Sequence, residues 1–327
     1  MTAKIRVLVT TVPFGEVDRR PLEILEAAGV EVVMNPLNRK LTSADLASMI
    51  PGIDYLIAGT EMIDDAVLSK ADRLKLIARV GIGLDSVDLN AARRRGIPVT
   101  YTPDAPSEAV ADLTIGLILS CLRQIHTANA RMHRGEWHRH FGRRLGELTV
   151  GLVGLGRIGS GVARRLGGFN PRRVLGHDLL TRDQLRIPDF VELVDFEQLV
   201  SESDVVSIHV PLNGKTRDWF DQRVLSSMKV DAVLVNTARG GIVNETDLLQ
   251  TMTGGNLSAV ALDVFDVEPY SGPLSEIERV LLTSHMGSMS VDSRTRMEVE
   301  AAEEVARAVH DLAPLRPVPE TAYESKV

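Results

Sequence analysis

The chain has 327 residues, of which 44% are hydrophobic and 25% charged, and its formal net charge is −7. This length exceeds what one ordinary core holds, so we expect two domains, and the composition is typical of soluble globular proteins. The negative charge argues against a nucleic-acid partner, and no apolar run approaches the ~20 residues that a membrane helix needs.

The N-terminal segment and the cysteine content bear on the compartment. The first residues, MTAKIRVLVTT, contain an apolar run that is too short for a signal peptide and that we interpret as a first β-strand. The single cysteine, Cys121, cannot form an internal disulfide, and its apolar helical surroundings favour a buried thiol over a nucleophile. We therefore expect a cytoplasmic protein.

The first hundred residues alternate between strand-like and helix-like segments. Because helices separate the strands, crossover connections and a parallel, doubly wound sheet are expected. We predict strands at 5–10, 30–34, 55–58, 74–78 and 97–101, and helices at 20–28, 43–49 and 64–70.

The fourth predicted strand is followed by a glycine-containing stretch, RVGIGLD, at residues 79–85. Successive backbone N–H groups there could form a concave anion site for a small carboxylate. A simple strand-ending turn accounts for the same residues equally well, so both interpretations stay open at this point.

A proline-containing stretch at residues 102–106 predicts the boundary between two domains. The helix predicted at 109–123 is apolar on most of its faces, so it must be buried, and we expect it between domains or subunits. Residues 126–144 are rich in histidine and arginine but have no regular ligand spacing, so we expect no metal site. This segment is predicted to be a solvated connection anchored by Trp137.

A dinucleotide fingerprint follows the boundary. The apolar run LTVGLV leads into Gly154-x-Gly156-x-x-Gly159 and then an amphipathic segment, which is the strand, turn and helix order that binds a pyrophosphate. Gly154 permits the sharp turn, Gly156 lets the pyrophosphate approach, and Gly159 allows close packing of helix on strand. Asp178 follows Gly159 by 19 residues, after a second apolar run, where an acidic residue is expected to take the ribose hydroxyls.

Each later predicted strand ends in polar residues. Strands are expected at 203–210, 232–236, 257–262 and 280–284, with a long helix at 292–312 and a loose tail over the last dozen residues. Ligands bind at the carboxyl edge of an open parallel sheet, so the polar residues that follow these strands should converge there. They are His209, Arg239, Asp263, Glu268 and His285.

Three of these side chains suit hydride transfer at C2 of a 2-hydroxy acid. Such a reaction needs an imidazole to carry the hydroxyl proton, a carboxylate to orient that imidazole, and a guanidinium to hold the substrate carboxylate. His285, Glu268 and Arg239 supply one of each.

The motifs in their order resemble the D-isomer-specific 2-hydroxyacid dehydrogenases, and most of all the branch that contains 3-phosphoglycerate dehydrogenase. The resemblance covers about residues 50–310 and rests on RVGIGLDSVDLNAARRRGIPVTYTPD, GLVGLGRIG, HVPL, VNTARGGIVNE, ALDVFDVEP and LTSHMG. It implies two doubly wound α/β domains, with a Rossmann NAD-binding domain (103–285) inserted into a flavodoxin-like substrate-binding domain (1–102 and 286–327).

The resemblance also implies roles for individual residues. Arg239, Glu268 and His285 would be the catalytic set, and Asp178 would select NAD over NADP. Asp263 would hold the nicotinamide carboxamide. The other implied NAD contacts are Gly154, Gly156, Arg157, Ile158, Gly159, Val210, Pro211, Thr237 and Gly287, and the substrate carboxylate would meet Gly81, Ile82 and Gly83 as well as Arg239.

Members of this family typically pair as dimers through the Rossmann domain, so we expect a homodimer that acts on a small 2-hydroxy or 2-keto acid. Phosphoglycerate-oxidising relatives usually carry an arginine just before the position of Thr60, whereas this chain has IAGTE at 57–61. Phosphoglycerate, glyoxylate or hydroxypyruvate, and a sugar-derived acid therefore remain open as substrates. An NAD(H)-sensing co-repressor of the same fold is the alternative from another functional class.

Overall fold

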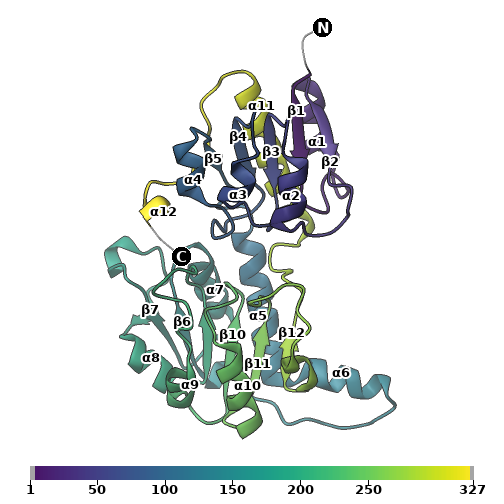
Figure 1. Cartoon of the computed structure of the whole chain (residues 1–327). Helices are drawn as coiled ribbons and strands as arrows, with labels where there is room; N and C mark the ends of the chain where they lie inside the picture. The colour runs from purple at the N-terminus through teal and green to yellow at the C-terminus, as the bar shows by residue number, and fades with distance from the viewer. Residues whose placement is uncertain (1–3, 325–327) are drawn as a thin grey trace. The chain divides into compact units, whose positions relative to one another are not determined.

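The computed structural model describes residues 4–324. Two compact units make up the chain: unit 1 is Met1–Pro106 with Ser288–Val327, and unit 2 is Ser107–Gly287 (Figure 1). Unit 2 is thus inserted into the sequence of unit 1. Each unit is an α/β fold built on its own parallel sheet.

Unit 1 contains a five-stranded parallel sheet in the order β2-β1-β3-β4-β5. This order is that of flavodoxin-like folds and confirms the expectation for this part of the chain. The strands are β1 (Arg6–Val9), β2 (Glu31–Met34), β3 (Tyr55–Ala58), β4 (Leu76–Arg79) and β5 (Val99–Thr100).

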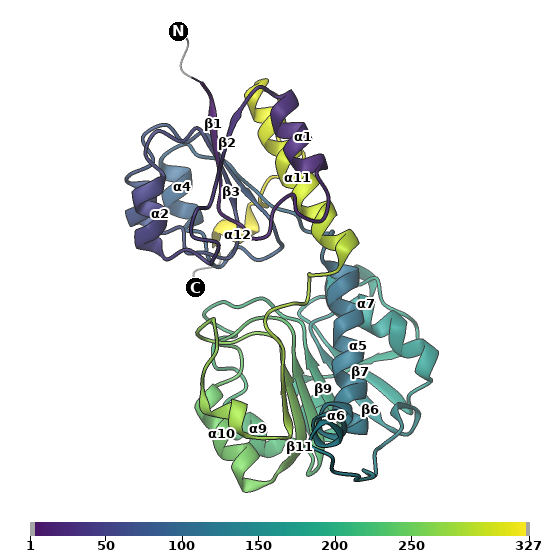
Figure 2. The ribbon, with the colours of Figure 1, turned by 90° about the vertical axis from the view of Figure 1, so that its right-hand side faces the viewer.

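Successive residues of a strand point to opposite faces of its sheet. Helices pack on both faces of this sheet and form a separate hydrophobic cluster on each. Val7 and Val9 of β1 pack with α1 (Arg20–Ala27) and α11 (Val291–Val309), which lie side by side in Figure 2. Leu8 instead packs in the cluster formed with α2 (Ser43–Met49), α3 (Asp65–Leu68) and α4 (Leu89–Arg94). The sequence analysis did not predict α4.

The C-terminal segment of unit 1 is not the loose tail that the sequence analysis predicted. Pro317 forms an antiparallel bridge with Thr100 of β5, and the Val318 N–H donates to the Val99 carbonyl at 3.0 Å. The segment ends in α12 (Thr321–Glu324), and the Arg93 guanidinium lies over the Tyr323 ring. The edge of the sheet thus pairs with the segment, and only residues 325–327 of the predicted tail lie outside the described residues.

Unit 2 contains a seven-stranded parallel sheet in the order β12-β11-β10-β9-β6-β7-β8. This is the Rossmann order, with the reversal of strand order between β6 and β9. The strands are β6 (Thr149–Val153), β7 (Arg173–His177), β8 (Val191–Leu193), β9 (Val205–Ile208), β10 (Ala232–Asn236), β11 (Leu257–Leu262) and β12 (Val280–Leu282).

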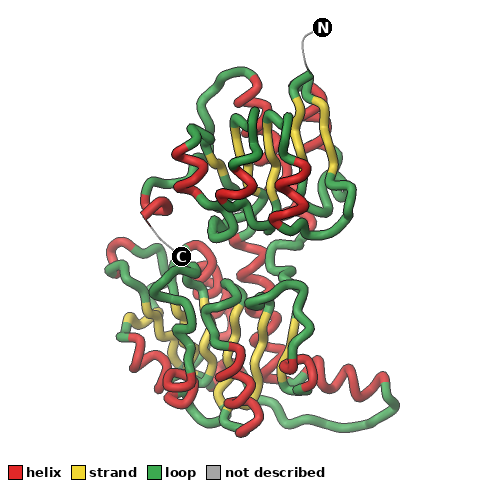
Figure 3. The backbone as a smooth tube through the Cα atoms, viewed as in Figure 1, coloured by secondary structure: helices red, strands yellow, loops and turns green. Residues whose placement is uncertain are grey.

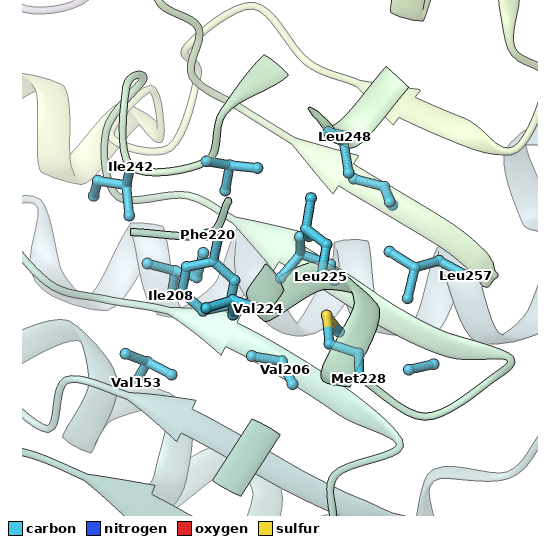
Figure 4. Close-up of a cluster of buried hydrophobic side chains, with 14 of the residues drawn as sticks. Val153, Val206, Ile208, Phe220, Val224, Leu225, Met228, Ile242, Leu248 and Leu257 are labelled. Carbon is cyan, nitrogen blue, oxygen red and sulfur yellow. The ribbon is translucent and has the colours of Figure 1, made fainter. Parts of the chain in front are cut away.

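The two faces of this sheet carry separate hydrophobic clusters. One cluster includes Val206 and Ile208 of β9 and Phe220, shown in Figure 4, and packs with α8 (Phe196–Glu202), α9 (Gln222–Ser227) and α10 (Glu245–Gly254). The opposite cluster packs with α5 (Ser107–Arg123) and α7 (Arg157–Leu166). Figure 2 shows these two helices on the side of the sheet away from α9 and α10. Among its described residues, unit 2 also contains four 3₁₀ turns: Leu145–Glu147, Gly167–Phe169, Arg182–Gln184 and Pro273–Glu276.

The apolar helix α5 corrects one prediction. Its buried side chains pack on β10, β11 and α7 within unit 2, so its apolar character is explained without a domain or subunit interface. Cys121 lies in this packed face with 3% of its surface exposed. Burial raises the pKa of the thiol to about 12, which agrees with the buried, unreactive cysteine that the sequence predicted.

The histidine-rich segment differs from the connection that the sequence predicted. Residues Ile125–His133 form helix α6, and Figure 3 shows this helix and the loop after it extending outward from unit 2. Trp137 is 81% exposed and Phe141 is fully exposed, so Trp137 does not anchor the segment. In the described part of the chain, no group of three or more metal-ligating side chains is placed to hold an ion.

No single helix within residues 4–324 is long and apolar enough to cross a membrane. Helices α5 and α6 reach the required length and composition only as a pair bent by 67°, and α5 packs on the sheet of unit 2. The cytoplasmic location stays a prediction.

Candidate active site

The glycine turn after β6 assigns a different physical role to each of its glycines. Gly154 has a φ of +94°, and a Cβ there would lie 2.7 Å from the His209 carbonyl oxygen. A Cβ on Gly159 would lie 2.0 Å from the Gly154 carbonyl oxygen, so helix and turn approach too closely for a side chain. A Cβ on Gly156 would meet nothing within 4 Å. Gly154 and Gly159 are therefore required by the fold, whereas Gly156 leaves open space at the helix N-terminus.

The N-terminus of α7 is the part of this turn that faces outward. Gly156 is the N-cap residue, and both Gly156 and Arg157 are exposed, while Ile158 is partly buried. An exposed helix N-terminus presents backbone N–H groups and the positive end of the helix dipole, which favours a phosphate.

Asp178 lies beside the same turn, directly after β7. One carboxylate oxygen accepts from the Leu155 N–H at 2.7 Å, and the other accepts from the Leu180 N–H at 3.0 Å. The fold thus places the Asp178 carboxylate beside the glycine turn, and its contact with ribose hydroxyls stays a prediction.

His285 and Glu268 form a hydrogen-bonded pair after the last strands of the sheet. The Nδ1 of His285 lies 2.9 and 3.0 Å from the two oxygens of the Glu268 carboxylate. Glu268 Oε1 also accepts from the Phe265 N–H at 3.2 Å. A carboxylate accepts but does not donate, so the Nδ1 must carry the proton, and this leaves Nε2 for a substrate. The His285 side chain keeps 34% of its surface exposed.

Asp263 holds the segment around His285 through hydrogen bonds that the sequence did not predict. Its side chain is buried and accepts hydrogen bonds from the Thr283 hydroxyl, the Met286 N–H and the Gly287 N–H, at 2.6, 2.9 and 2.8 Å. Gly287 approaches so closely that a Cβ there would lie 3.1 Å from the Asp263 carboxylate. A threonine such as Thr283 is common after a strand, so nothing in the sequence indicated its contact with Asp263.

The remaining polar residues follow the neighbouring strands β9 and β10. Arg239 is partly buried, and its Nη1 donates to the Ala238 carbonyl at 2.7 Å. The Nε2 of His209 lies 2.9 Å from the Ser207 hydroxyl, and desolvation lowers the pKa of His209 to about 3. Among these polar residues, His285 and Glu268 are hydrogen-bonded to each other, and Asp263 is hydrogen-bonded to the chain on both sides of His285.

Other predicted NAD contacts lie at the ends of the same strands. The Thr237 hydroxyl is 2.9 Å from that of Thr114 on α5, so this side chain is held by the fold. Val210 packs partly against the hydrophobic cluster of β9, and the exposed Pro211 accepts a hydrogen bond from the Thr216 hydroxyl at 2.7 Å.

Two acidic side chains that the sequence analysis missed flank the segment that carries Glu268. Glu245 accepts a hydrogen bond from the Asp266 N–H at 2.8 Å. Burial raises the pKa of both Glu245 and Asp266. The Glu245 carboxylate thereby holds the loop between β11 and Glu268.

In unit 1, the loop that follows β4 is held from both sides. The Arg79 guanidinium donates to the Gly83 carbonyl from Nε and Nη2, at 3.1 and 2.8 Å. The Gly81 N–H donates to the Thr102 hydroxyl at 2.8 Å, and Gly81 has a φ of +142°. The Gly81 N–H is thus bonded to Thr102, and Ile82 and Gly83 stay the predicted N–H donors of this loop to a substrate carboxylate.

Known proteins resemble this chain in sequence and identify its family. Residues 115–287 match the family described as D-isomer specific 2-hydroxyacid dehydrogenase, NAD binding domain. The chain is 37% identical over 295 residues to a D-3-phosphoglycerate dehydrogenase from Methanocaldococcus jannaschii, covering 88% of this chain and 55% of that protein. It is also 35% identical over 297 residues to a hydroxypyruvate reductase from Thermotoga maritima, covering 86% of this chain and 94% of that one.

Solved structures have the same fold as this chain. The TT0316 protein from Thermus thermophilus superposes with a TM-score of 0.87 at 37% identity, over 96% of this chain and all of that one. The chain thus spans about half the length of the archaeal relative but nearly all of the bacterial reductase. It belongs to the D-isomer-specific 2-hydroxyacid dehydrogenase family.

Proposed function

We propose that this protein is an NAD-dependent D-2-hydroxyacid dehydrogenase that interconverts a 2-keto acid and the corresponding 2-hydroxy acid. The observation that carries the proposal is the His285–Glu268 pair, with Nδ1 held by the carboxylate at 2.9 Å. The pair follows the strands of a Rossmann sheet whose glycine turn leaves space for a pyrophosphate at Gly156.

Each catalytic side chain has one task in this proposal. His285 donates a proton from Nε2 to the keto oxygen during reduction and removes it during oxidation. Glu268 holds the ring in the tautomer that exposes Nε2 and stabilises its positive charge. Arg239 binds the substrate carboxylate and polarises the adjacent carbonyl, because a guanidinium matches a carboxylate in two-point geometry.

The turn and Asp178 are the proposed cofactor contacts. NADH, when bound, supplies the hydride. The exposed N-terminus of α7 holds the pyrophosphate, and Asp178 accepts from the ribose hydroxyls. A 2′-phosphate on the same ribose would meet the Asp178 carboxylate, so we expect a strong preference for NADH over NADPH.

We further propose that the substrate is not phosphorylated. Glu61 follows β3, next to the strand that leads into the 80–84 loop, and its buried carboxylate accepts from the Thr10 hydroxyl and the Gly59 N–H. A negative charge at this edge of the sheet disfavours a phosphate. Glyoxylate, hydroxypyruvate and sugar-derived 2-keto acids are thus favoured over phosphohydroxypyruvate.

The test is oxidation of NADH and of NADPH against these four classes of 2-keto acid. His285→Ala is the active-site variant, and His310→Ala, at an exposed histidine of unit 1, is the matched control. We expect NADH-dependent turnover that falls at least about 100-fold in His285→Ala and stays unchanged in the control. Equal activity in His285→Ala and the unaltered protein would contradict the proposal, and a preference for phosphohydroxypyruvate would contradict the substrate class.

The comparisons do not support the co-repressor alternative, since the relatives described above are named as a dehydrogenase and a reductase. The same assay separates the two functions. Tight NADH binding without turnover on any of the four substrate classes would favour a sensor.

We also propose that the protein forms a homodimer through unit 2, with α6 and the loop after it as part of the interface. Exposed large apolar side chains often mark a protein contact where they lie together, and Trp137 and Phe141 are exposed and only four residues apart in the loop after α6. The double variant Trp137→Ser, Phe141→Ser should lower the mass measured by light scattering to that of one chain. Val230→Ser, at an exposed valine elsewhere in unit 2, should leave the dimer intact. A monomeric unaltered protein would refute the proposal.

A further inference from the structure

His285 has a backbone conformation that few non-glycine residues adopt. Its φ is +51°, in the left-handed region, where a side chain crowds the following carbonyl. A residue stays in this region only when the surrounding structure holds it there, and such residues cluster at active sites. The question is therefore which contacts hold His285.

Asp263 contacts the chain on both sides of His285. The Thr283 hydroxyl, two residues before the histidine, donates to Asp263 Oδ1, and so does the Met286 N–H of the peptide that directly follows His285. The Gly287 N–H donates to Oδ2. Three donors within five residues thus meet one buried carboxylate, and the Asp263 N–H is itself anchored on β10 through the Asn236 carbonyl at 3.0 Å.

We infer that Asp263 is a positioning residue that holds the 283–287 segment so that the His285 ring meets Glu268. This inference rests on the proposed function, in which His285 is the acid and base. It differs from the role that family resemblance suggested, in which Asp263 holds the nicotinamide carboxamide. Both carboxylate oxygens accept hydrogen bonds from the 283–287 segment, and the side chain is 1% exposed.

An asparagine at this position cannot reproduce the contact. The carboxylate accepts through both oxygens, whereas an amide accepts through one and donates through the other. In either amide orientation an N–H group of Met286 or Gly287 faces a second donor. The left-handed conformation of His285 then loses its restraint, and the ring moves away from Glu268.

The experiment compares Asp263→Asn with a graded pair at the neighbouring donor, Thr283→Val and Thr283→Ser. Valine removes the hydroxyl at nearly constant shape, whereas serine keeps it. For each variant we would measure kcat with the best 2-keto acid, the Kd of NADH by fluorescence, and the proton resonance of the His285 Nδ1–H that bonds to Glu268. His285→Ala assigns that resonance, and circular dichroism verifies folding.

We expect Asp263→Asn to lower kcat by about 10²-fold, approaching the loss in His285→Ala, because proton transfer contributes about 10²–10⁴-fold. Thr283→Val should lower kcat by about 3- to 10-fold, the value of one hydrogen bond, and Thr283→Ser should retain kcat. The Kd of NADH should stay within about 3-fold throughout. The Nδ1–H resonance should be lost in Asp263→Asn and kept in Thr283→Ser.

Two results would overturn the inference. One is a large rise in the Kd of NADH in Asp263→Asn with kcat retained at saturating NADH, which identifies a cofactor anchor instead. The other is an unchanged Nδ1–H resonance in a folded Asp263→Asn. If no 2-keto acid is turned over by the unaltered protein, the proposed function fails, but the resonance still decides whether Asp263 positions His285.

Discussion

Replacing Gly156 with alanine should weaken NADH binding while leaving the fold intact, and replacing Gly159 with alanine should do the reverse. The two glycines lie three residues apart in one turn, so they form a matched pair. A Cβ at Gly156 would meet nothing within 4 Å, whereas a Cβ at Gly159 would lie 2.0 Å from the Gly154 carbonyl oxygen. The first methyl group therefore enters space that we assign to the pyrophosphate, and the second enters the protein itself.

The magnitudes follow from the cost of overpacking. An extra methyl group in a tightly packed place costs about 1–3 kcal/mol. For Gly156→Ala this appears in binding, as a rise in the Kd of NADH of roughly 5- to 150-fold. Its stability should change by no more than about 1 kcal/mol, because glycine is only moderately better than alanine as a helix N-cap. For Gly159→Ala, the cost of at least about 1–3 kcal/mol appears in the free energy of unfolding.

Fluorescence titration with NADH and urea unfolding of the cofactor-free protein measure the two effects. Gly156→Ala should shift the titration and leave the urea midpoint nearly unchanged. Normal NADH binding by Gly156→Ala would refute the assignment of the pyrophosphate to this turn. A loss of stability in Gly156→Ala as large as that in Gly159→Ala would refute the separation of roles.

Two further predictions concern titration and catalysis. His209 has a pKa of about 3 in the folded protein against 6.5 in the unfolded chain, so below pH ~6.5 the unfolded state binds a proton that the folded state does not. Stability is then lost as the pH falls, by at most about 2 kcal/mol between pH 7 and pH 5; His209→Gln should lose correspondingly less in urea unfolding, and an equal loss would contradict the prediction. Glu268→Gln keeps a hydrogen-bond acceptor for His285 but removes the charge, so kcat should fall by about 10²-fold with little change in the Kd of NADH. A change confined to NADH binding would contradict the role assigned to Glu268.

The sequence by itself determined the elements whose signals are local. Short apolar runs separated by helical segments predicted two parallel sheets, and the glycine spacing with Asp178 predicted the Rossmann turn. Such signals are reliable because strand periodicity and turn chemistry act over a few residues. The polar residues after β10, β11 and β12 were identified in the same way, because parallel strands bring their carboxyl ends to one edge.

Only the tertiary structure decided which partners those residues have. Asp263 and Thr283 are 20 residues apart and meet because β11 and β12 are neighbours in the sheet. The sequence predicted a loose C-terminal tail, whereas in the structure this segment forms backbone hydrogen bonds with the edge strand β5. Helix α5 appeared to need a partner subunit, whereas the sheet of its own unit covers it. In each case the deciding contact joins residues distant in sequence, and its free energy depends on packing that no local pattern contains.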